Sequence, residues 1–380
     1  MEMKELIRNA FTERFGTPEG EFFASAGRIN LIGEHTDYNE GFVFPGAIDK
    51  VIMAEIRPNG TDRVRVFSID IDEYCEFGLR EEDAPEQGWA RYIFGVCREI
   101  IKRGGKVGGF DTVFAGNVPL GAGLSSSAAL ESCFAFALNE LFNEGKIDKF
   151  ELAKIGQSTE HNYCGVNCGI MDQFASVFGK KGSLIRLDCR DLSYEYFPFA
   201  PEHHRLVLID SRVKHELKDS PYNKRRESCE RVAKSLGVPS LRDVSLAELN
   251  AVKVTLSDED YRRAKYVIEE RDRVLTVCAA LERGDYDEVG KMMYATHEGL
   301  SKDYEVSCEE LDFLADTAKE LGVTGSRIMG GGFGGCTINL VENDLYDKFV
   351  TEAVARFKQK YGHEPKVYDV IISDGARRVE

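Results

Sequence analysis

Between two apolar segments lies Pro119-Leu-Gly-Ala-Gly-Leu-Ser-Ser-Ser-Ala-Ala-Leu-Glu131, a stretch with two glycines and three consecutive serines. Its last residues open a run, 128–141, whose apolar side chains recur at helical spacing and predict a helix. The start of a helix carries unpaired backbone N–H groups and the positive end of the helix dipole, and glycine lets an anion approach the backbone closely. Serine hydroxyls donate to phosphate oxygens or ligate Mg2+. The stretch is therefore typical of a phosphate-binding loop that leads into a helix.

A helix cap is a simpler explanation for these serines, but capping requires only one of them, Ser125 or Ser126. We therefore favour phosphate binding. The loop is not a Walker-type P-loop, because no Gly-Lys-Ser or Gly-Lys-Thr follows the glycines. It is not a protein-kinase glycine loop either, because the chain contains no His-Arg-Asp and no Asp-Phe-Gly.

The composition of the 380-residue chain is that of a globular protein large enough for two domains, with 43% hydrophobic residues. Its net charge of −16 argues against a nucleic-acid partner, which would need a basic stripe. The N-terminus has no signal-peptide pattern and no apolar run reaches the length of a membrane span, so we expect a cytoplasmic protein without a membrane partner. The ten cysteines lack metal-site spacing and are expected to be free thiols.

The hydrophobic periodicity predicts a mixture of helices and strands. A predicted strand at residues 110–115 leads into the phosphate loop, which gives the loop the strand–loop–helix context that it requires. Further helices are expected at 4–15, 89–102, 150–163, 285–300 and 345–361, and further strands within 42–79 and at 184–187, 194–199, 205–210 and 366–372. The short stretch 199–204 marks the expected boundary between an N-terminal domain, residues 1–200, and a C-terminal domain, residues 201–380.

A second motif, Gly27-Arg-Ile-Asn-Leu-Ile-Gly-Glu-His-Thr-Asp-Tyr-Asn39, places Arg28, Glu34, His35 and Asp37 within ten residues, among hydrophobic anchors. A solvated loop would explain the polar residues but not the interleaved apolar residues and glycines. A metal site is disfavoured, because three nearly adjacent ligands rarely form a cage by themselves. A ligand with many hydroxyl groups fits better, because carboxylates accept hydrogen bonds from hydroxyls while His and Arg donate them.

Two further features are ambiguous from the local pattern. Asp172, in Cys168-Gly-Ile-Met-Asp-Gln-Phe174, is on its own most simply a cap of the next helix. Gly330, Gly332 and Gly335 match Gly-x-Gly-x-x-Gly, but they lead into a β-rich segment late in the chain, which excludes the dinucleotide-binding interpretation. A tight turn between two strands is one explanation for these glycines, and we favour a close backbone approach to a ligand or to the phosphate loop.

Three motifs in this order resemble those of one kinase family. The motif at 27–39 resembles the galactokinase signature, residues 119–127 resemble the ATP motif of the galactokinase, homoserine, mevalonate and phosphomevalonate kinase (GHMP) superfamily, and residues 330–335 resemble its third motif. The resemblance implies an α+β, two-domain GHMP kinase fold with the active site in the inter-domain cleft. It also implies Mg2+-dependent transfer of the γ-phosphoryl group of ATP to the anomeric hydroxyl of α-D-galactose.

The resemblance further implies roles for individual residues. Asp172 would be the catalytic base, which reverses the capping interpretation, and Arg28 would stabilise its carboxylate and the charge of the transferring phosphoryl group. Ser127 and Glu160 would ligate Mg2+. The galactose-binding candidates are Glu34, His35, Thr36, Asp37 and Tyr222, and the nucleotide-binding candidates are Ser68, Gly121, Ala122, Gly123, Leu124, Ser125, Ser126 and Ser127.

Three positions depart from the family pattern and leave the substrate breadth open. Asn167 stands where proline is usual, Arg91 stands where asparagine is usual, and the third motif begins Met329-Gly-Gly-Gly332. A kinase for a related sugar, N-acetylgalactosamine or arabinose, is therefore the alternative function. A non-catalytic galactose sensor is less favoured, because the serine loop is complete and Asp172 is present. Nothing in the sequence indicates a protein partner, and a monomer is favoured.

Overall fold

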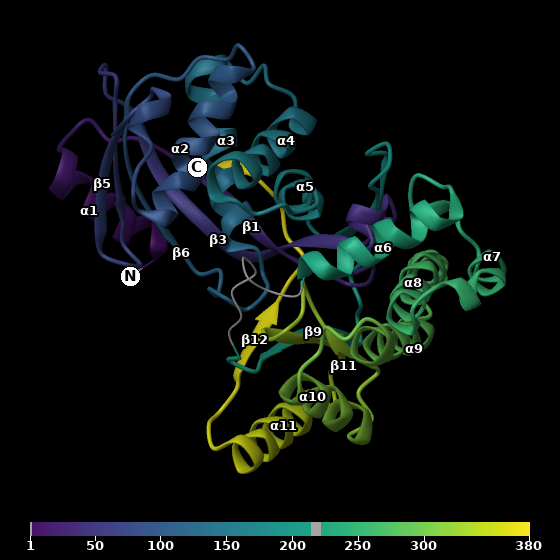
Figure 1. The fold of residues 1–380 in the computed structure, drawn as a ribbon. Coiled ribbons are helices and arrows are strands. Elements are labelled where there is room, and N and C mark those ends of the chain that lie inside the picture. Colours follow the sequence, from purple (N-terminus) through teal and green to yellow (C-terminus); the bar gives the residue numbers. More distant parts are fainter. Residues whose placement is uncertain (1, 214–221) are drawn as a thin grey trace.

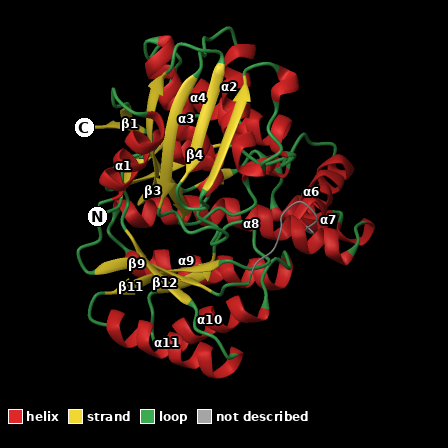
Figure 2. Cartoon of the chain, turned by 90° about the vertical axis from the view of Figure 1, so that its left-hand side faces the viewer, coloured by secondary structure: helices red, strands yellow, loops and turns green. Residues whose placement is uncertain are grey.

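A six-stranded sheet forms the N-terminal half of the protein in the computed structural model, which describes residues 2–213 and 222–380 (Figure 1, Figure 2). Its strand order is β13-β1-β3-β6-β4-β5. Strands β4 and β6 pair in parallel, and the other neighbouring strands pair antiparallel. The strands are β1 (Glu21–Asn30), β3 (Pro45–Pro58), β4 (Arg63–Ser68), β5 (Glu73–Gly78), β6 (Phe110–Gly116) and β13 (Arg377–Val379).

Alternation of side chains along these strands gives the sheet two apolar faces. On β1, Phe22 packs with helix α1 (Met3–Phe15) through Ile7 and Phe11, whereas Phe23 belongs to the main core on the opposite face. Four helices contribute to that main core and cover one face of the sheet, whereas α1 covers only part of the other face (Figure 2). They are α2 (Gly88–Lys102), α3 (Ser126–Asn143), α4 (Lys149–Thr159) and α5 (Met171–Phe178).

The C-terminal half is built on a four-stranded antiparallel sheet with the order β10-β11-β9-β12. Val207 and Ile209 of β9 face helices α10 and α11, whereas Leu206 and Leu208 join the main core that continues into the N-terminal half. The two halves therefore share one continuous core. The elements are β9 (His204–Asp210), α6 (Tyr222–Leu236), α7 (Leu246–Ala251), α8 (Asp258–Glu282), α9 (Tyr286–Glu298), α10 (Glu309–Glu320), β10 (Gly325–Ile328), β11 (Cys336–Glu342), α11 (Tyr346–Tyr361) and β12 (Lys366–Val370).

The chain crosses between the halves more than once. A small third sheet, β2-β7-β8, consists of β2 (Phe42–Val43), β7 (Ser183–Asp188) and β8 (Tyr194–Pro198). The last strand, β13, pairs with β1, so the end of the chain returns to the N-terminal sheet (Figure 1). The α+β architecture predicted from the sequence is confirmed. The predicted boundary near residue 200 stays a prediction, and β13 lies on the N-terminal side of it in space.

Two predicted helices end differently from the expectation. The helix expected at 150–163 is α4 followed by a π-helical turn, Glu160–Cys164, and the one expected at 285–300 is α9 followed by a second π-helical turn, Gly299–Asp303. π-helical turns are rare and often mark functional sites. The first of them carries Glu160, and the second ends directly before Tyr304.

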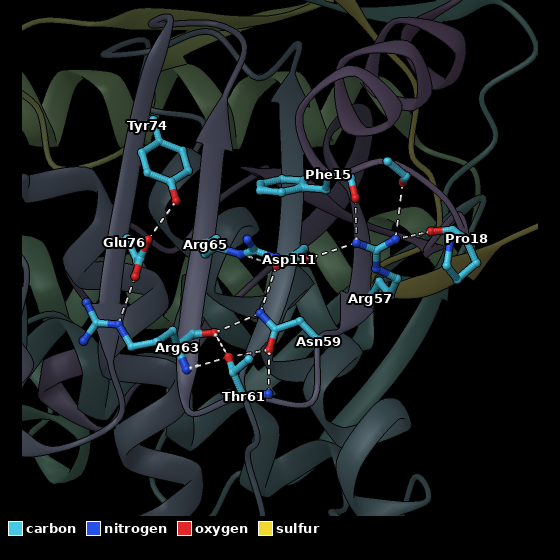
Figure 3. Close-up of polar contacts among 11 residues, drawn as sticks. Phe15, Pro18, Arg57, Asn59, Thr61, Arg63, Arg65, Tyr74, Glu76 and Asp111 are labelled. Atoms are coloured by element: carbon cyan, nitrogen blue, oxygen red, sulfur yellow. Dashed lines mark hydrogen bonds and ion pairs between the residues drawn. The ribbon is translucent and has the colours of Figure 1, made fainter.

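An ionic network on the outer side of the N-terminal sheet joins three strands to the end of α1 (Figure 3). The fully buried carboxylate of Asp111 accepts hydrogen bonds from Arg65 (2.7 and 2.9 Å), Arg57 (2.8 Å) and Asn59 (2.9 Å). Arg57 also donates to the carbonyl of Phe15, the last residue of α1, at 3.1 Å. The network fixes α1 against the sheet.

All ten cysteines are free thiols, as expected. Among the described helices, none has both the length and the apolar character that a membrane crossing requires.

Candidate active site

A cavity of about 580 Å³ is lined by residues from both halves of the chain. Its lining includes residues of the motif at 27–39, which we call the sugar-like motif, of the phosphate loop, of the segment 164–172 and of the third glycine motif at 329–335. This volume lies in the range typical of small-molecule sites. Motifs separated by some 300 residues in the sequence therefore converge on one pocket.

The phosphate loop and the third glycine motif are in direct backbone contact. A Cβ on Gly123 would lie 3.4 Å from the carbonyl oxygen of Met329, and one on Gly330 would lie 3.7 Å from the Cα of Gly123. Both glycines have positive φ, 75° and 83°, which side chains disfavour. The third motif connects β10 to β11, so it is a turn between strands and also a close approach to the phosphate loop. Both explanations considered for these glycines hold.

Ser125 begins helix α3 but does not cap it in the usual way. Its backbone is left-handed (φ 56°), and its hydroxyl donates to Asp172 Oδ2, while its oxygen accepts no hydrogen bond from a backbone N–H of the described helix. The left-handed conformation is unfavourable for a residue with a side chain and is often found at functional sites. The capping explanation is therefore wrong for the Ser125 hydroxyl.

Asp172 and Arg28 form a bidentate ion pair at the centre of the cavity. Arg28 Nε lies 2.8 Å from Asp172 Oδ1, and Arg28 Nη2 lies 3.0 Å from Asp172 Oδ2. Arg28 also donates to the carbonyl of Gly123 in the phosphate loop. Its side chain is 5% exposed, whereas that of Asp172 is 28% exposed and so remains accessible from the cavity. Asp172 lies in the first turn of α5, where its side chain pairs with Arg28 rather than capping the helix.

The two magnesium candidates lie near each other. Both Ser127 and Glu160 line the cavity, and the Ser127 hydroxyl is close enough to the Glu160 carboxylate to lower its pKa. Burial raises the pKa of Glu160 to about 7, with the Ser127 hydrogen bond opposing the shift and the charge of Asp172 adding to it. Glu131 was not singled out from the sequence. It is fully buried, accepts a hydrogen bond from Gln173 at 3.1 Å, and has a pKa raised well above its usual value by burial and then by Glu160.

Asp37 is a partly buried residue whose carboxylate lies against Gly169. Burial raises the pKa of Asp37 to about 6; a hydrogen bond from the Tyr38 backbone opposes this, and the charges of Asp172 and Glu34 add to it. A Cβ on Gly169 would lie 1.9 Å from Asp37 Oδ2, so the glycine leaves the space that this carboxylate occupies.

His35 and Glu34 line the same end of the cavity. Burial lowers the pKa of His35 to about 3, with the Gly331 backbone opposing and Arg225 adding to the shift, so the imidazole is neutral. Glu34 Oε1 accepts from the Gly330 N–H at 2.9 Å and from Arg327 Nη2 at 3.0 Å.

Arg327 is a structural residue of the site that the sequence reasoning missed. It is fully buried in β10 and donates to the Leu31 carbonyl at 2.8 Å as well as to Glu34. No local signal identifies it, because Glu34 lies 293 positions earlier in the chain. Arg327 therefore ties the sugar-like motif to the C-terminal sheet.

Several predicted residues lie elsewhere. Among the described residues, Ser68, Thr36 and Ala122 do not line the cavity, and all three are buried. The Thr36 hydroxyl closes a turn by donating to the carbonyls of Gly33 (3.0 Å) and Phe42 (2.6 Å). Ser68 ends β4. The side chain of Tyr222 lies outside the described part of the structure.

Comparisons with known proteins agree with this geometry. Residues 9–58 match the galactokinase galactose-binding signature, residues 91–180 the GHMP kinases N terminal domain, and residues 278–359 the GHMP kinases C terminal domain. A galactokinase of Thermotoga petrophila is 43% identical and covers 93% of this chain and 98% of its own. A galactokinase of Clostridium beijerinckii is 40% identical with complete coverage of both chains.

Solved structures show the same relationship. The crystal structure of Lactococcus lactis galactokinase complexed with galactose superimposes with a TM-score of 0.94, at 35% identity and 99% coverage of both chains. The mevalonate kinase of Methanococcus jannaschii has a TM-score of 0.67 at 17% identity, covers 93% of this chain and 99% of its own, and shares the fold. On the strength of the full-length relatives and the matching site motifs, this chain belongs to the galactokinase family of the GHMP kinases.

Proposed function

We propose that this protein transfers the γ-phosphoryl group of ATP to the anomeric hydroxyl of α-D-galactose, giving galactose 1-phosphate and ADP. The observation that carries the proposal is the Asp172–Arg28 pair, which lies in one cavity with the phosphate loop and the sugar-like motif. Membership of the galactokinase family and the likeness to a galactokinase solved with galactose support the same substrates.

In this mechanism Asp172 is the base. Its carboxylate accepts the proton of the anomeric hydroxyl, and the oxygen attacks the γ-phosphorus of ATP. The bond from that phosphorus to the bridging oxygen of the β-phosphate breaks, and ADP leaves. Because phosphoryl transfer depends mainly on positioning and charge neutralisation, a base fixed by a bidentate arginine suits it.

Arg28 has two tasks in this proposal. It orients Asp172 through two hydrogen bonds and places a positive charge beside the phosphate loop, where charge develops on the transferring group. The bond from Arg28 to the Gly123 carbonyl keeps the loop and the base in one arrangement. Gly121 to Ser127 would bind the triphosphate through backbone N–H groups and serine hydroxyls at the start of α3.

Ser127 and Glu160 fit a magnesium ion, because both offer oxygen ligands and both line the cavity together with the phosphate loop. Within residues 2–213 and 222–380, no group of three or more His, Cys, Asp or Glu side chains could hold a metal. Mg2+ commonly uses one or two protein ligands and completes its shell with phosphate oxygens and water. When bound, the ion neutralises charge on the β- and γ-phosphates.

Asp37 and His35 would hold the sugar. An ionised Asp37 accepts hydrogen bonds from sugar hydroxyls, and the neutral imidazole of His35 adds a second polar group to the same cavity lining. Glu34 uses one carboxylate oxygen for Arg327 and Gly330 and lines the cavity. Such fixed polar partners penalise a sugar whose hydroxyls are placed differently.

The Asp172→Asn variant tests the proposal. We expect kcat to fall by about 10²- to 10⁴-fold, the usual contribution of a general base, while calorimetry still detects galactose and ATP binding. Asp243→Asn is a matched control, because Asp243 forms a comparable bidentate pair with Arg190 at the surface (3.0 and 2.8 Å). An unchanged kcat in Asp172→Asn would remove the base assignment.

The substrate is tested with a coupled ADP-release assay. Galactose, N-acetylgalactosamine, arabinose, glucose and mevalonate are compared at equal concentrations with ATP and Mg2+. Turnover highest with galactose supports the proposal, and turnover highest with another sugar replaces the substrate. Galactose binding without turnover would instead indicate a sensor.

A further inference from the structure

Tyr304 is a buried residue of the C-terminal half that contacts the sugar-like motif. It follows the π-helical turn Gly299–Asp303 and has no exposed surface. Its ring centroid lies 4.9 Å from that of His35 and 4.8 Å from that of Tyr266. The ring therefore packs directly behind a candidate galactose-binding side chain.

A chain of hydrogen bonds connects the Tyr304 hydroxyl to the same imidazole. Tyr304 Oη lies 2.8 Å from Tyr38 Oη, and Tyr38 Oη lies 2.7 Å from His35 Nδ1. At the far end, Cys229 Sγ lies 3.4 Å from Tyr304 Oη. The chain thus runs from helix α6 through Tyr304 to the residue that lines the cavity.

The chemistry of the groups gives this chain a direction. A neutral imidazole has one acceptor nitrogen and one N–H, and a phenol donates more readily to an imidazole nitrogen than an imidazole N–H donates to a phenol oxygen. Tyr38 therefore donates to His35 Nδ1, and Tyr304 donates to Tyr38. The proton of His35 then resides on Nε2, because the partner of one ring nitrogen fixes the state of the other.

The backbone around Tyr304 touches the third glycine motif as well. Its carbonyl accepts from Arg225 Nε at 2.8 Å, and the carbonyl of Val306 accepts from the Phe333 N–H at 2.7 Å. A Cβ on Gly332 would lie only 2.3 Å from the Val306 oxygen. The short segment Tyr304–Val306 is therefore packed against the glycine motif on one side and against His35 on the other.

We propose that Tyr304 is a positioning residue for the sugar site, whose hydroxyl orients the cavity-lining His35 imidazole through Tyr38 and holds it in the Nε2–H form. This inference rests on the proposed galactose kinase function. His35 has a left-handed backbone (φ 61°), which is uncommon for a residue with a side chain and is often found at functional sites. The inference assigns a role to a residue 266 positions away from the motif that it serves.

Tyr304→Phe tests the inference, because it removes the hydroxyl and keeps the ring. We expect the KM for galactose to rise about tenfold, the effect of one lost buried hydrogen bond with its partner left unpaired, and the KM for ATP to stay within about twofold. Tyr294→Phe is the matched control, since the Tyr294 hydroxyl makes one part-buried hydrogen bond, to the Val323 carbonyl at 2.9 Å, and Tyr294 is not among the described residues that line the cavity.

A spectroscopic measurement separates orientation from packing. In the ¹⁵N spectrum of labelled protein, the His35 resonances should indicate the Nε2–H tautomer in the natural sequence and a mixture of tautomers in Tyr304→Phe. Equal rises in both KM values, with the tautomer unchanged, would reduce Tyr304 to a packing residue. An unchanged KM for galactose would overturn the inference.

A second variant keeps the test decisive if Tyr304→Phe folds poorly. Tyr38→Phe removes the middle member of the chain, and the same selective rise in the KM for galactose is expected. If the proposed function is wrong, the unsubstituted protein itself shows no turnover with galactose. This result differs from a failure of the Tyr304 inference, in which only the variants are informative. Calorimetric galactose affinity would still report on the role of Tyr304 if the unsubstituted protein showed no turnover.

Discussion

Replacing Gly169 with alanine should damage galactose binding while leaving the fold intact. The added Cβ would lie 1.9 Å from Asp37 Oδ2 and 2.5 Å from its Cγ, far inside contact distance, so the carboxylate must move by more than an ångström. Gly169 does not have a positive φ, and alanine can therefore adopt its backbone conformation. The displaced atoms are the end of a side chain, so the change is confined to the sugar site.

The size of the effect follows from the hydrogen bonds that Asp37 would lose. A hydrogen bond to a charged group contributes about 1.5–3 kcal/mol, so losing one bond between Asp37 and a sugar hydroxyl lowers kcat/KM for galactose by about 10- to 150-fold. The ADP-release assay with galactose titrated at saturating ATP measures this change, and the KM for ATP should stay nearly constant.

Gly88→Ala provides a matched control for the same kind of substitution. A Cβ on Gly88 meets no described atom within 4 Å, although Gly88 also lines the cavity. In the Gly88→Ala variant the KM for galactose should equal that of the unsubstituted protein. If Gly169→Ala also kept it, Asp37 would not be a galactose ligand in the proposed arrangement.

Three further results are expected. Burial raises the pKa of Asp37 to about 6, and only the ionised carboxylate accepts hydrogen bonds from hydroxyls on both oxygens. The KM for galactose in steady-state assays should therefore rise about tenfold from pH 7 to pH 5. The Asp37→Asn variant should lack this pH dependence. Burial raises the pKa of Glu160 to about 7, so protons compete with the metal for this carboxylate, and the Mg2+ concentration for half-maximal activity should rise about tenfold from pH 8 to pH 6. The Glu160→Ala variant should need far more Mg2+ at every pH. An unaltered Mg2+ titration in this variant would remove Glu160 from the metal site. The Asp111→Asn variant leaves Arg57 and Arg65 without their buried carboxylate, so the free energy of unfolding, measured in urea, should fall by about 2–4 kcal/mol while kcat stays unchanged. A change in kcat would show that this ionic network affects the active site.

The parts of the site that the sequence predicted are those with a local signature. The phosphate loop combines glycines, serines and a helix start within 13 residues, and its place between β6 and α3 is confirmed. The pairing of Arg28 with Asp172 was expected from the family resemblance, and the structure places them at 2.8 and 3.0 Å. Their catalytic roles stay predictions.

The sequence could not predict the direction of individual hydroxyls. Ser125 and Thr36 both belong to recognised motifs, yet Ser125 donates to Asp172 and Thr36 donates to two backbone carbonyls. Each choice depends on which acceptor the folded chain brings within about 3 Å, and that is a property of the tertiary structure. A motif therefore indicates the kind of site without assigning every side chain in it.

Residues that position the site from a distance have no local signature at all. Tyr304 and Arg327 lie in ordinary segments, and their partners Tyr38 and Glu34 are 266 and 293 positions away. A single sequence shows neither contact, because both form only when the two halves share one core. Glu131 is similar, since its burial next to Glu160 depends on how α3 packs against α4.

The buried Arg327–Glu34 pair explains why the two halves meet in one arrangement. Arg327 satisfies the carbonyls of Asn30 and Leu31 at the end of β1 as well as Glu34, and Glu34 also accepts from Gly330. An apolar residue of similar size in place of Arg327 would remove its hydrogen bonds to both carbonyls and would leave the Glu34 charge buried without its cation. Its contribution is therefore geometric. It fixes the third glycine motif against the sugar-like motif, and the third glycine motif in turn packs against Gly123, whose carbonyl accepts from Arg28.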